Sequence, residues 1–387
     1  MTLGVGMEKF DVVIVGARCA GSATARLLAE GGMRVLLVDR ATFPSDTVST
    51  HAMAFHGSHL LQRWGLFERL VAAGTPNSHE ATLRLGDIRL DRFPAPAASA
   101  GWIAPRRTVL DTMLAEDAQK CGATLWDNTT VSGVKGGERV AGVTVRRADG
   151  TSVDVAADLV VGADGAFSRV ARAVKAATID ERSSAMTGSY AYFSGTGLDH
   201  NRLVLADQRA VLVFPTNDDL ACIAVGSHHD DDFAGANDET FAAAARTLTP
   251  EVADAIESGQ RETRYTVFKP QPSRVVASHG PGWALVGDAG FYMDPVTGQG
   301  IANAFLGAQL LADTVLAGND LSEYQARRDQ LLRDMFDITA TVSRMEWTND
   351  EVVGEFMRFR AAAEATLAEV SRLWTNDLPS TAHAARV

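Results

Sequence analysis

The sequence predicts an α/β fold, and three observations indicate this class. A β-branched run at 10–15, an Ala- and Leu-rich segment ending near Glu30 and a second apolar run at 34–39 form a β-α-β unit. Apolar runs at 158–163 and 283–286 have the composition of strands buried on both faces of a parallel sheet. The strand-like segments between residues 187 and 275 are instead separated by hairpin turns. We therefore expect a Rossmann-like domain joined to an antiparallel sheet.

Length and composition limit the possible functions. The chain has 387 residues, 46% hydrophobic and 22% charged, which suits a globular protein of about two domains. A net charge of −12 argues against nucleic acid or an anionic membrane as the main partner. The three cysteines are far apart and lack metal-ligand spacing, so we expect neither disulfides nor a metal. The first apolar run is too short for a signal peptide or a membrane span, and a cytoplasmic location is expected.

The first β-α-β unit carries a phosphate-binding pattern. A loop from Gly16 to Gly21 joins the strand to the helix, and Asp39 follows at the end of the second strand. This arrangement is typical of dinucleotide-binding folds, where the acidic residue accepts hydrogen bonds from ribose hydroxyls. Arg18 replaces the middle glycine, so the loop path must change or the side chain must touch phosphate. The alternative to ribose binding is that Asp39 is a solvent-exposed residue at the end of the second strand. The expected cofactor-binding residues here are Gly16, Ala17, Arg18, Cys19, Ala20, Gly21, Asp39 and Arg40.

A second glycine-rich stretch follows the strand at 283–286. It contains Gly287-Asp288-Ala289, then Asp294-Pro295, then Gly298-Gln299-Gly300 before an apolar helix. This order resembles the second flavin-contacting segment of the FAD-dependent aromatic hydroxylases, the group A flavoprotein monooxygenases typified by para-hydroxybenzoate hydroxylase. The resemblance implies that Asp288 binds the ribityl chain of FAD. It also implies that the loop and helix start face the isoalloxazine ring; the residues concerned are Gly287, Pro295, Gly298, Gln299, Gly300 and Ile301.

Two further motifs resemble the same family. Arg107 opens a helix with the pattern Arg-x-x-Leu-Asp-x-x-Leu and fits better than Arg106. An arginine in a first helical turn opposes the helix dipole, so we expect a nearby anion such as the FAD pyrophosphate; a solvated arginine is the alternative. Asp164 and Gly165 begin an Asp-Gly motif, which the resemblance places beside FAD and the route of NAD(P)H. Alternatively, this segment is a strand–turn–helix junction capped by Ser168.

The resemblance also suggests a substrate cavity. The polar segment at 43–51 would pass near the flavin and the substrate, so Ser49 and His51 are candidates to touch either; a solvated loop histidine is the alternative. The antiparallel sheet, with the hairpin at 80–95 and one helix at 238–247, would cover the flavin. Four aromatic residues would line the cavity or simply form core: Tyr190, Tyr192, Phe214 and Phe268. The candidates for a catalytic contribution are His51, Tyr190, Tyr192, Phe214 and Pro295.

From these expectations we predict the domain boundaries and the activity of the protein. The FAD-binding domain comprises 8–78, 100–178 and 276–325, the substrate-binding sheet domain comprises 79–99 and 179–275, and 326–387 forms a C-terminal helical segment. The resemblance implies an FAD-dependent monooxygenase that uses NAD(P)H and O2, through a flavin C4a-hydroperoxide, to hydroxylate or epoxidise a small aromatic or polyketide-like substrate.

Three alternatives remain open. A double-bond reductase or dehydrogenase of the geranylgeranyl reductase type would use the same flavin without inserting oxygen. A flavin-dependent halogenase would need a cavity lysine and a Trp-x-Trp element, and the sequence has no Trp-x-Trp. A flavin-binding module without catalytic activity is the third.

Overall fold

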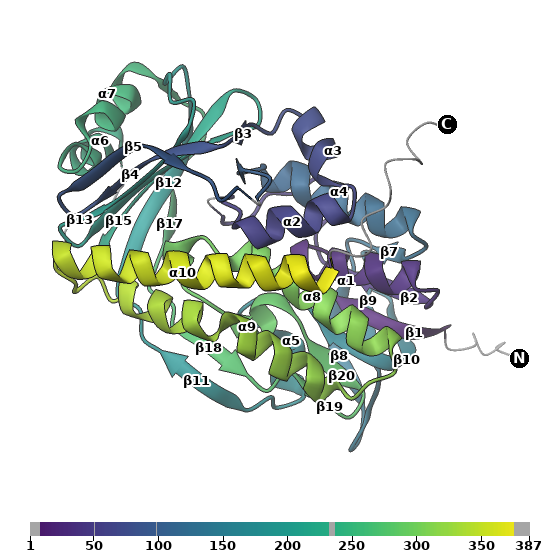
Figure 1. Ribbon diagram of the computed structural model, residues 1–387. Coiled ribbons are helices and arrows are strands. Elements are labelled where there is room, and N and C mark those ends of the chain that lie inside the picture. The colour runs from purple at the N-terminus through teal and green to yellow at the C-terminus, as the bar shows by residue number, and fades with distance from the viewer. Residues whose placement is uncertain (1–7, 50, 98, 232–236, 375–387) are drawn as a thin grey trace, which may run out of the picture.

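The computed structural model describes residues 8–49, 51–97, 99–231 and 237–374. Its first large sheet confirms the predicted α/β class and lies on the right in Figure 1. Neighbouring strands of this sheet follow the order β19 (His279–Gly280), β20 (Trp283–Leu285), β10 (Ser152–Gly162), β1 (Glu8–Val15), β2 (Val35–Val38) and β7 (Thr124–Trp126). From β20 to β7 every pair is parallel, so the carboxyl ends of these strands meet at one edge. This edge is where ligands bind in open α/β sheets.

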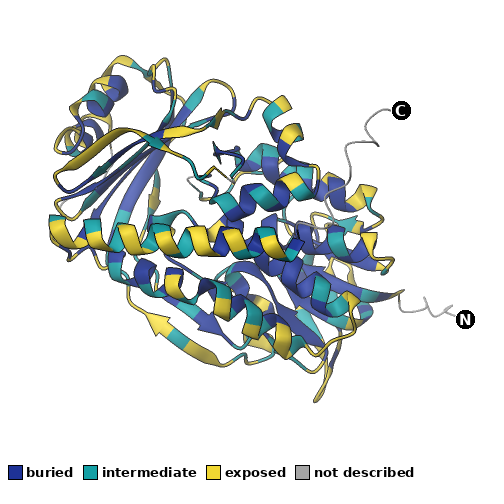
Figure 2. Cartoon of the chain, viewed as in Figure 1, coloured by how far each residue is buried: buried dark blue, intermediate teal, exposed yellow. Residues whose placement is uncertain are grey.

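Both faces of this sheet are covered, which explains the continuous apolar runs. One face packs against helices and the other against an antiparallel extension, and Figure 2 shows the strands as buried. The helices are α1 (Cys19–Glu30), α2 (Phe55–Arg63), α3 (Phe67–Ala72), α4 (Arg107–Lys120), α8 (Gly300–Leu316) and α9 (Leu321–Val342). The extension consists of β8 (Thr130–Gly136), β9 (Val140–Arg146) and the short helix α5 (Arg169–Ala173).

The strand β10 differs from its prediction. The sequence predicted a strand from residue 158, yet the strand begins at Ser152 and runs over 11 residues. Its first half pairs antiparallel with β9, and its second half pairs parallel with β1. The weak strand formers Ala156, Ala157 and Asp158 interrupt the apolar pattern without breaking the backbone pairing.

The second large sheet lies on the left in Figure 1. Its order is β16 (Gln260–Arg261), β12 (Met186–Ser194), β15 (Leu220–His228), β14 (Arg209–Thr216), β13 (Asn201–Ala206), β4 (Glu80–Leu85) and β5 (Ile88–Pro94), and β17 (Thr266–Phe268) also pairs with β12. The expectation of an antiparallel sheet is wrong at one pair, because β13 and β4 run parallel. Two helices cover the outer face instead of one, α6 (Asp238–Arg246) and α7 (Pro250–Ser258). Pro250 begins a new helix because its ring fits the first helical position but not an interior one.

Short strands complete the chain between these sheets. A three-stranded sheet contains β11 (Thr178–Arg182), β18 (Ser273–Val276) and β21 (Phe291–Tyr292), and β3 (Asn77–Ser78) pairs with β6 (Trp102–Ile103). None of these pairs was predicted, since two to five residues carry little periodic signal.

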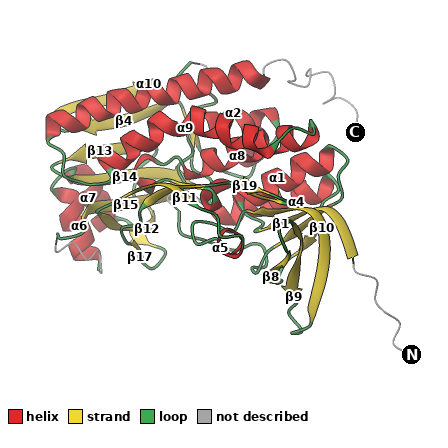
Figure 3. Cartoon of the chain, turned by 90° about the horizontal axis from the view of Figure 1, so that it is seen from below, coloured by secondary structure: helices red, strands yellow, loops and turns green. Residues whose placement is uncertain are grey.

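The C-terminal helices join the two halves of the molecule. The helix α10 (Asn349–Trp374) packs against α9 and α2 and also against β4 and β13, and Figure 3 shows it lying along the length of the protein. The proposed domain boundary at 325/326 falls inside α9, and four buried side chains of this helix belong to the core around α1 and α8: Tyr324, Leu332, Met335 and Phe336. Residues 375–387 of the predicted helical segment lie outside the described residues. Within the described part of the chain, no helix combines the length and apolarity required to span a bilayer.

Candidate flavin and substrate site

The loop after β1 makes a turn that only glycine fits. A Cβ on Gly16 would lie 2.4 Å from the Ala163 carbonyl oxygen, and one on Gly21 would lie 1.7 Å from the Gly16 carbonyl oxygen. The Asp39 carboxylate accepts hydrogen bonds from the Ala17 backbone N–H at 2.6 Å and the Ala41 N–H at 2.8 Å. Asp39 thus fixes the loop between the ends of β1 and β2, and each of its oxygens keeps a lone pair for a ribose hydroxyl. Arg40 is exposed.

Arg18 points away from the loop toward α4. Its Nη1 lies 2.7 Å from Oδ2 of Asp111, and its Nη2 donates to the Ser45 hydroxyl at 3.1 Å. Asp111 has no accessible surface and also accepts hydrogen bonds from Arg107 and from the Cys19 thiol. The loop path is therefore held by protein contacts of Arg18. Arg107 pairs with Asp111, one turn further along the same helix. Its contact with the FAD pyrophosphate stays a prediction.

Asp288 lies on the short 3-10 helix η1 (Gly287–Ala289), at the carboxyl end of β20. A Cβ on Gly287 would lie 2.7 Å from that of Ala20, so this turn packs against α1. Asp288 lines a cavity of about 430 Å³, and protein atoms surround its carboxyl group. This burial raises its pKa to about 6, although the charge of Arg107 acts in the opposite direction. Among the described residues, no hydrogen bond is donated to this carboxyl.

The loop between β21 and α8 carries unused hydrogen-bonding capacity. The 3-10 helix η2 (Pro295–Thr297) ends at Gly298 in the left-handed conformation (φ 66°). Gln299 is 4% exposed, and its Oε1 has no partner among the described residues. A Cβ added to Gly300, in the first turn of α8, would have no described atom within 4 Å, and Ile301 is buried behind it. Pro295 is exposed.

The Asp164 side chain has a structural partner. It accepts hydrogen bonds from the Ser168 hydroxyl at 2.5 Å and the Arg169 N–H at 2.6 Å, while Ser168 caps α5 through the Ala171 N–H. The Asp164 carboxylate thus takes part in a strand–turn–helix junction capped by Ser168, which was the alternative to a cofactor contact. Gly165 has a φ of 81° and open space around its Cβ position. Behind this turn, three cationic residues line the cavity that reaches Asp288: Arg172, Lys175 and Arg274.

The inner face of the second sheet gathers the aromatic candidates. Tyr190, Tyr192 and Phe214 are buried in one cluster, with Phe268 packed against it. The alternation of the strands directs the intervening residues of β12, β14 and β15 toward α6 and α7. The cluster therefore lies on the face of the sheet opposite α6 and α7, where it includes Ala104 and contacts Ala52.

Ser49, His51 and Ala52 lie against this cluster, and Ala52 also approaches Gly298. The Ser49 N–H donates to Oη of Tyr190 at 3.0 Å, and the His51 ring stacks on Tyr192 with 5.4 Å between centroids. Ala52 packs against the aromatic cluster, and its Cβ lies 3.5 Å from a Cβ position on Gly298. His51 is 1% exposed, so it is not a solvated loop residue.

Two residues of this site were missed or undervalued. Asp111 is the buried centre of the contacts around Arg18, and its i+4 spacing from Arg107 was an available signal. Arg106 fits the helix motif less well than Arg107, yet its guanidinium lies 4.1 Å from the centroid of the Tyr192 ring. His228, His229 and Asp230 bring candidate metal-ligand atoms within 4.8 Å in the described region, but two of these residues are exposed and no further observation supports a metal there.

The residues present fit FAD. Asp39 follows the end of β2, and the half-buried carboxyl of Asp288 lies at the carboxyl end of β20. The buried amide oxygen of Gln299 has no partner among the described residues, and the start of α8 offers N–H groups beside open space. The fold and this site define an FAD-dependent oxidoreductase.

The chain belongs to the FAD binding domain family, which matches residues 9–337. It is similar to a 1H-pyrrole-2-carbonyl-[peptidyl-carrier protein] brominase from Pseudoalteromonas luteoviolacea, with 22% identity over 83% of this chain and 82% of the brominase. It is 29% identical to the menaquinone reductase of Mycolicibacterium smegmatis, over 86% of this chain and 83% of that enzyme. The structure of P. aeruginosa PqsL in complex with 2-aminobenzoylacetate superposes with a TM-score of 0.77 at 22% identity, covering 90% of this chain and all of PqsL. The resemblance to flavoprotein monooxygenases is thus confirmed at the level of family and fold.

Proposed function

We propose that this protein is an NAD(P)H- and O2-dependent monooxygenase acting on a small organic molecule. The observation that supports it is the buried aromatic cluster of Tyr190, Tyr192 and Phe214, which Ala52 links to the Gly298 loop. Oxygen transfer requires a site from which water is excluded. The aromatic wall, which Ala52 connects to the proposed flavin loop, would help to exclude water.

In this proposal the first sheet with its helices forms the FAD-binding unit and the second sheet forms the substrate unit. The Gly16–Gly21 loop and Asp39 hold the adenosine half of FAD, and Asp288 accepts hydrogen bonds from the ribityl hydroxyls. The N–H groups at the start of α8 favour negative charge on the ring. When bound, FAD supplies the redox chemistry with oxygen, while the protein orients the substrate and keeps water out.

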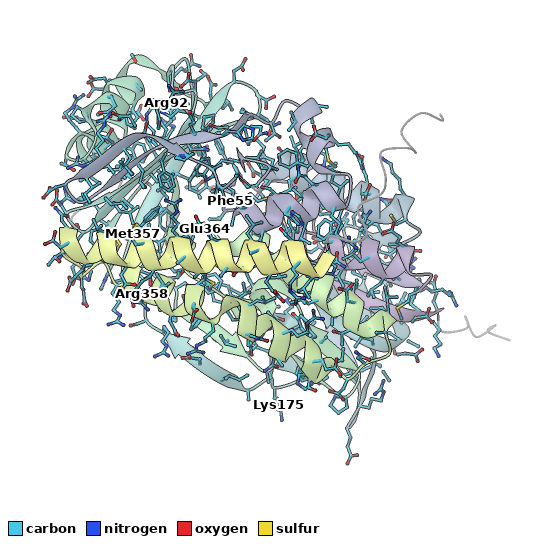
Figure 4. The ribbon with its side chains drawn as sticks, in the orientation of Figure 1. Phe55, Arg92, Lys175, Met357, Arg358 and Glu364 are labelled. Atoms are coloured by element: carbon cyan, nitrogen blue, oxygen red, sulfur yellow. The ribbon has the colours of Figure 1, made fainter. Side chains whose placement is uncertain are left out.

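The reductant has a candidate docking place. The cavity bounded by Arg172, Lys175 and Arg274 reaches Asp288, and its three cations suit the phosphates of NAD(P)H. Figure 4 shows the Lys175 side chain at the lower edge of the molecule. Replacing Arg274 with Gln should raise the KM for NAD(P)H without changing the FAD content.

A double-bond reductase is the second candidate, because a relative of 26% identity is named digeranylgeranylglycerophospholipid reductase and one of 29% identity is named menaquinone reductase. A halogenase receives less support from the site. All five lysines of the chain, at positions 9, 120, 135, 175 and 269, are exposed, so none of them lies inside the aromatic cluster.

Labelled dioxygen separates the two candidates. Extracts of small aromatic and polyketide-like molecules are incubated with the FAD-loaded protein, NAD(P)H and 18O2, and products are analysed by mass spectrometry. A monooxygenase places one labelled atom in the product. A product that forms equally well without oxygen, with two hydrogens added or removed and no label, would establish the reductase instead.

A further inference from the structure

Four polar atoms without hydrogen-bond partners gather at the edge of the aromatic cluster. Both ring nitrogens of His51, Oη of Tyr192 and Nε of Arg106 are buried and have no partner among the described residues. The residues His51 and Tyr192 are only 1% and 3% exposed. Water therefore has little access to replace the missing partners.

These atoms belong to one cluster built from three segments of the chain. The His51 ring stacks on Tyr192 at an angle of 19°, and the Arg106 guanidinium lies over the same Tyr192 ring, 4.1 Å from its centroid. Arg106 precedes α4, Tyr192 belongs to β12, and His51 follows the Ser49 segment. We name these three residues the polar cluster.

The polar cluster is unfavourable for the protein alone. A buried group whose hydrogen bond is not made destabilises the folded protein, and this cluster contains several such groups. His51 also has a φ of 65°, a left-handed backbone conformation that is uncommon outside glycine and strains the chain. Strain and missing partners in the same place are what a ligand site leaves when its ligand supplies the partners.

The charges of the cluster identify the kind of ligand. Burial lowers the pKa of His51 to about 3, with the charges of Arg107 and Arg106 acting in the same direction, so the imidazole is neutral. It offers one N–H donor, Tyr192 offers an O–H donor, and Arg106 offers a charged N–H donor. The carboxylate nearest to Arg106 is that of Asp46, at 3.2 Å, and this side chain is 45% exposed. Three donors with an incompletely neutralised positive charge favour an anionic oxygen.

The surroundings limit the shape of the ligand. Phe214, Leu212 and Ala224 lie in the same cluster as the two tyrosines and form an apolar, partly aromatic wall. A flat conjugated framework packs well against such a wall, whereas a flexible chain would lose more rotational freedom.

We propose that the polar cluster binds an ionised oxygen, carboxylate or acidic enol, on a flat conjugated substrate. Arg106, Tyr192 and His51 hold that oxygen, and Arg106 determines the specificity for acids. The assignment of this ligand as the substrate rests on the function proposed above.

Binding to the oxidised FAD-loaded protein tests this inference, with neither NAD(P)H nor turnover required. Two matched pairs of probes are titrated while the flavin absorbance is followed: 2-naphthoate against 2-naphthamide, and 4-hydroxycoumarin against coumarin. We expect at least one acid to bind at least about tenfold more tightly than its neutral partner, the size of one charge-assisted hydrogen bond. The pair that shows this preference distinguishes a carboxylate from an enol.

Three variants connect the preference to the cluster. Arg106→Gln should reduce the acid preference to roughly twofold or less, and Tyr192→Phe should weaken acid binding several-fold while leaving the neutral partner unchanged. Tyr192→Phe keeps the ring under Arg106, so it remains informative if Arg106→Gln folds poorly. Arg92→Gln is the matched control, because Arg92 is exposed and pairs only with Glu80 among the described residues. The FAD content of each variant verifies its folding.

The inference is overturned if no acid binds at millimolar concentration, if neutral partners bind equally well, or if Arg106→Gln keeps the preference. Its failure is distinct from failure of the proposed function. Acid preference without incorporation of 18O would remove the monooxygenase and leave the binding site, whereas incorporation without acid preference would do the reverse.

Discussion

Arg18 and Asp111 are 93 residues apart in the chain, and their side chains form an ion pair of 2.7 Å. The pair joins the Gly16–Gly21 loop to α4, and Arg107 binds the same carboxylate from one turn earlier. An arginine at the position of the middle glycine is thereby accommodated by a buried acid. The contacts of Arg18 with Ser45 and the Asp46 backbone extend this connection to the segment that leads to His51.

Asp111→Asn should strongly destabilise the protein. The change leaves two arginines without their buried anion, and removal of one partner from a buried ion pair costs about 3–5 kcal/mol. Urea denaturation of the FAD-free protein measures this loss. Glu364→Gln is the matched control, since Glu364 pairs with Arg360 at the same i, i+4 spacing on the exposed face of α10 and should contribute less than about 0.5 kcal/mol. Equal losses in the two variants would contradict the role given to Asp111.

Asp288→Ala should weaken FAD binding by about ten- to a hundredfold, because charge-assisted hydrogen bonds to ribityl hydroxyls contribute about 1.5–3 kcal/mol. Fluorescence titration of the FAD-free protein with FAD measures the affinity. The circular dichroism spectrum should stay unchanged. An unaltered dissociation constant would show that Asp288 does not contact the cofactor.

Asp288 should also make the FAD-free protein less stable as the pH rises. Its pKa is raised to about 6 in the folded state, so the folded protein binds the proton more tightly than the unfolded chain does. The contribution of Asp288 to the free energy of unfolding is therefore greatest below pH 4. It falls by about 2 kcal/mol as the pH rises to about 6. Asp288→Asn should remove this part of the pH dependence. Asp294 titrates in the same direction, with a pKa raised to about 6 by burial, so a residual slope is expected in the variant. The two unfolding profiles should differ between pH 4 and 6; identical profiles would contradict the assignment.

Gly300→Ala should separate folding from FAD binding. A Cβ at this position meets no described protein atom within 4 Å, and alanine favours a helix by up to about 1 kcal/mol, so the FAD-free protein should be as stable as wild type or more so. The same Cβ would enter the space proposed for the flavin ring and lower the affinity for FAD. Gly354→Ala in α10 likewise meets no described atom within 4 Å and should gain stability without any change in FAD binding. If both variants bind FAD normally, the start of α8 does not face the ring.

The sequence by itself determined the α/β class, the first β-α-β unit and the positions of the glycine-rich motifs. These features are local: a β-branched run, a helix-forming segment and a turn that only glycine permits are legible within a few residues. Gly16 and Gly21 are examples, because a Cβ at either position would collide with a backbone carbonyl oxygen. The aromatic face of the second sheet was also predictable, because strand alternation assigns Tyr190 and Tyr192 to the same side.

Only the tertiary structure decided which polar groups meet. Asp111 neutralises Arg18 through a contact across 93 residues. His51 is kept neutral by burial, to which Tyr192 of β12 contributes, and by the charges of Arg107 and Arg106, all of which lie far from it in the chain. The parallel pairing of β13 with β4 and the continuity of β10 were decided in the same way. Pairing partners, burial and electric fields depend on atoms brought together by folding, so a sequence pattern gives the type of residue at a site but not the neighbours that set its chemistry.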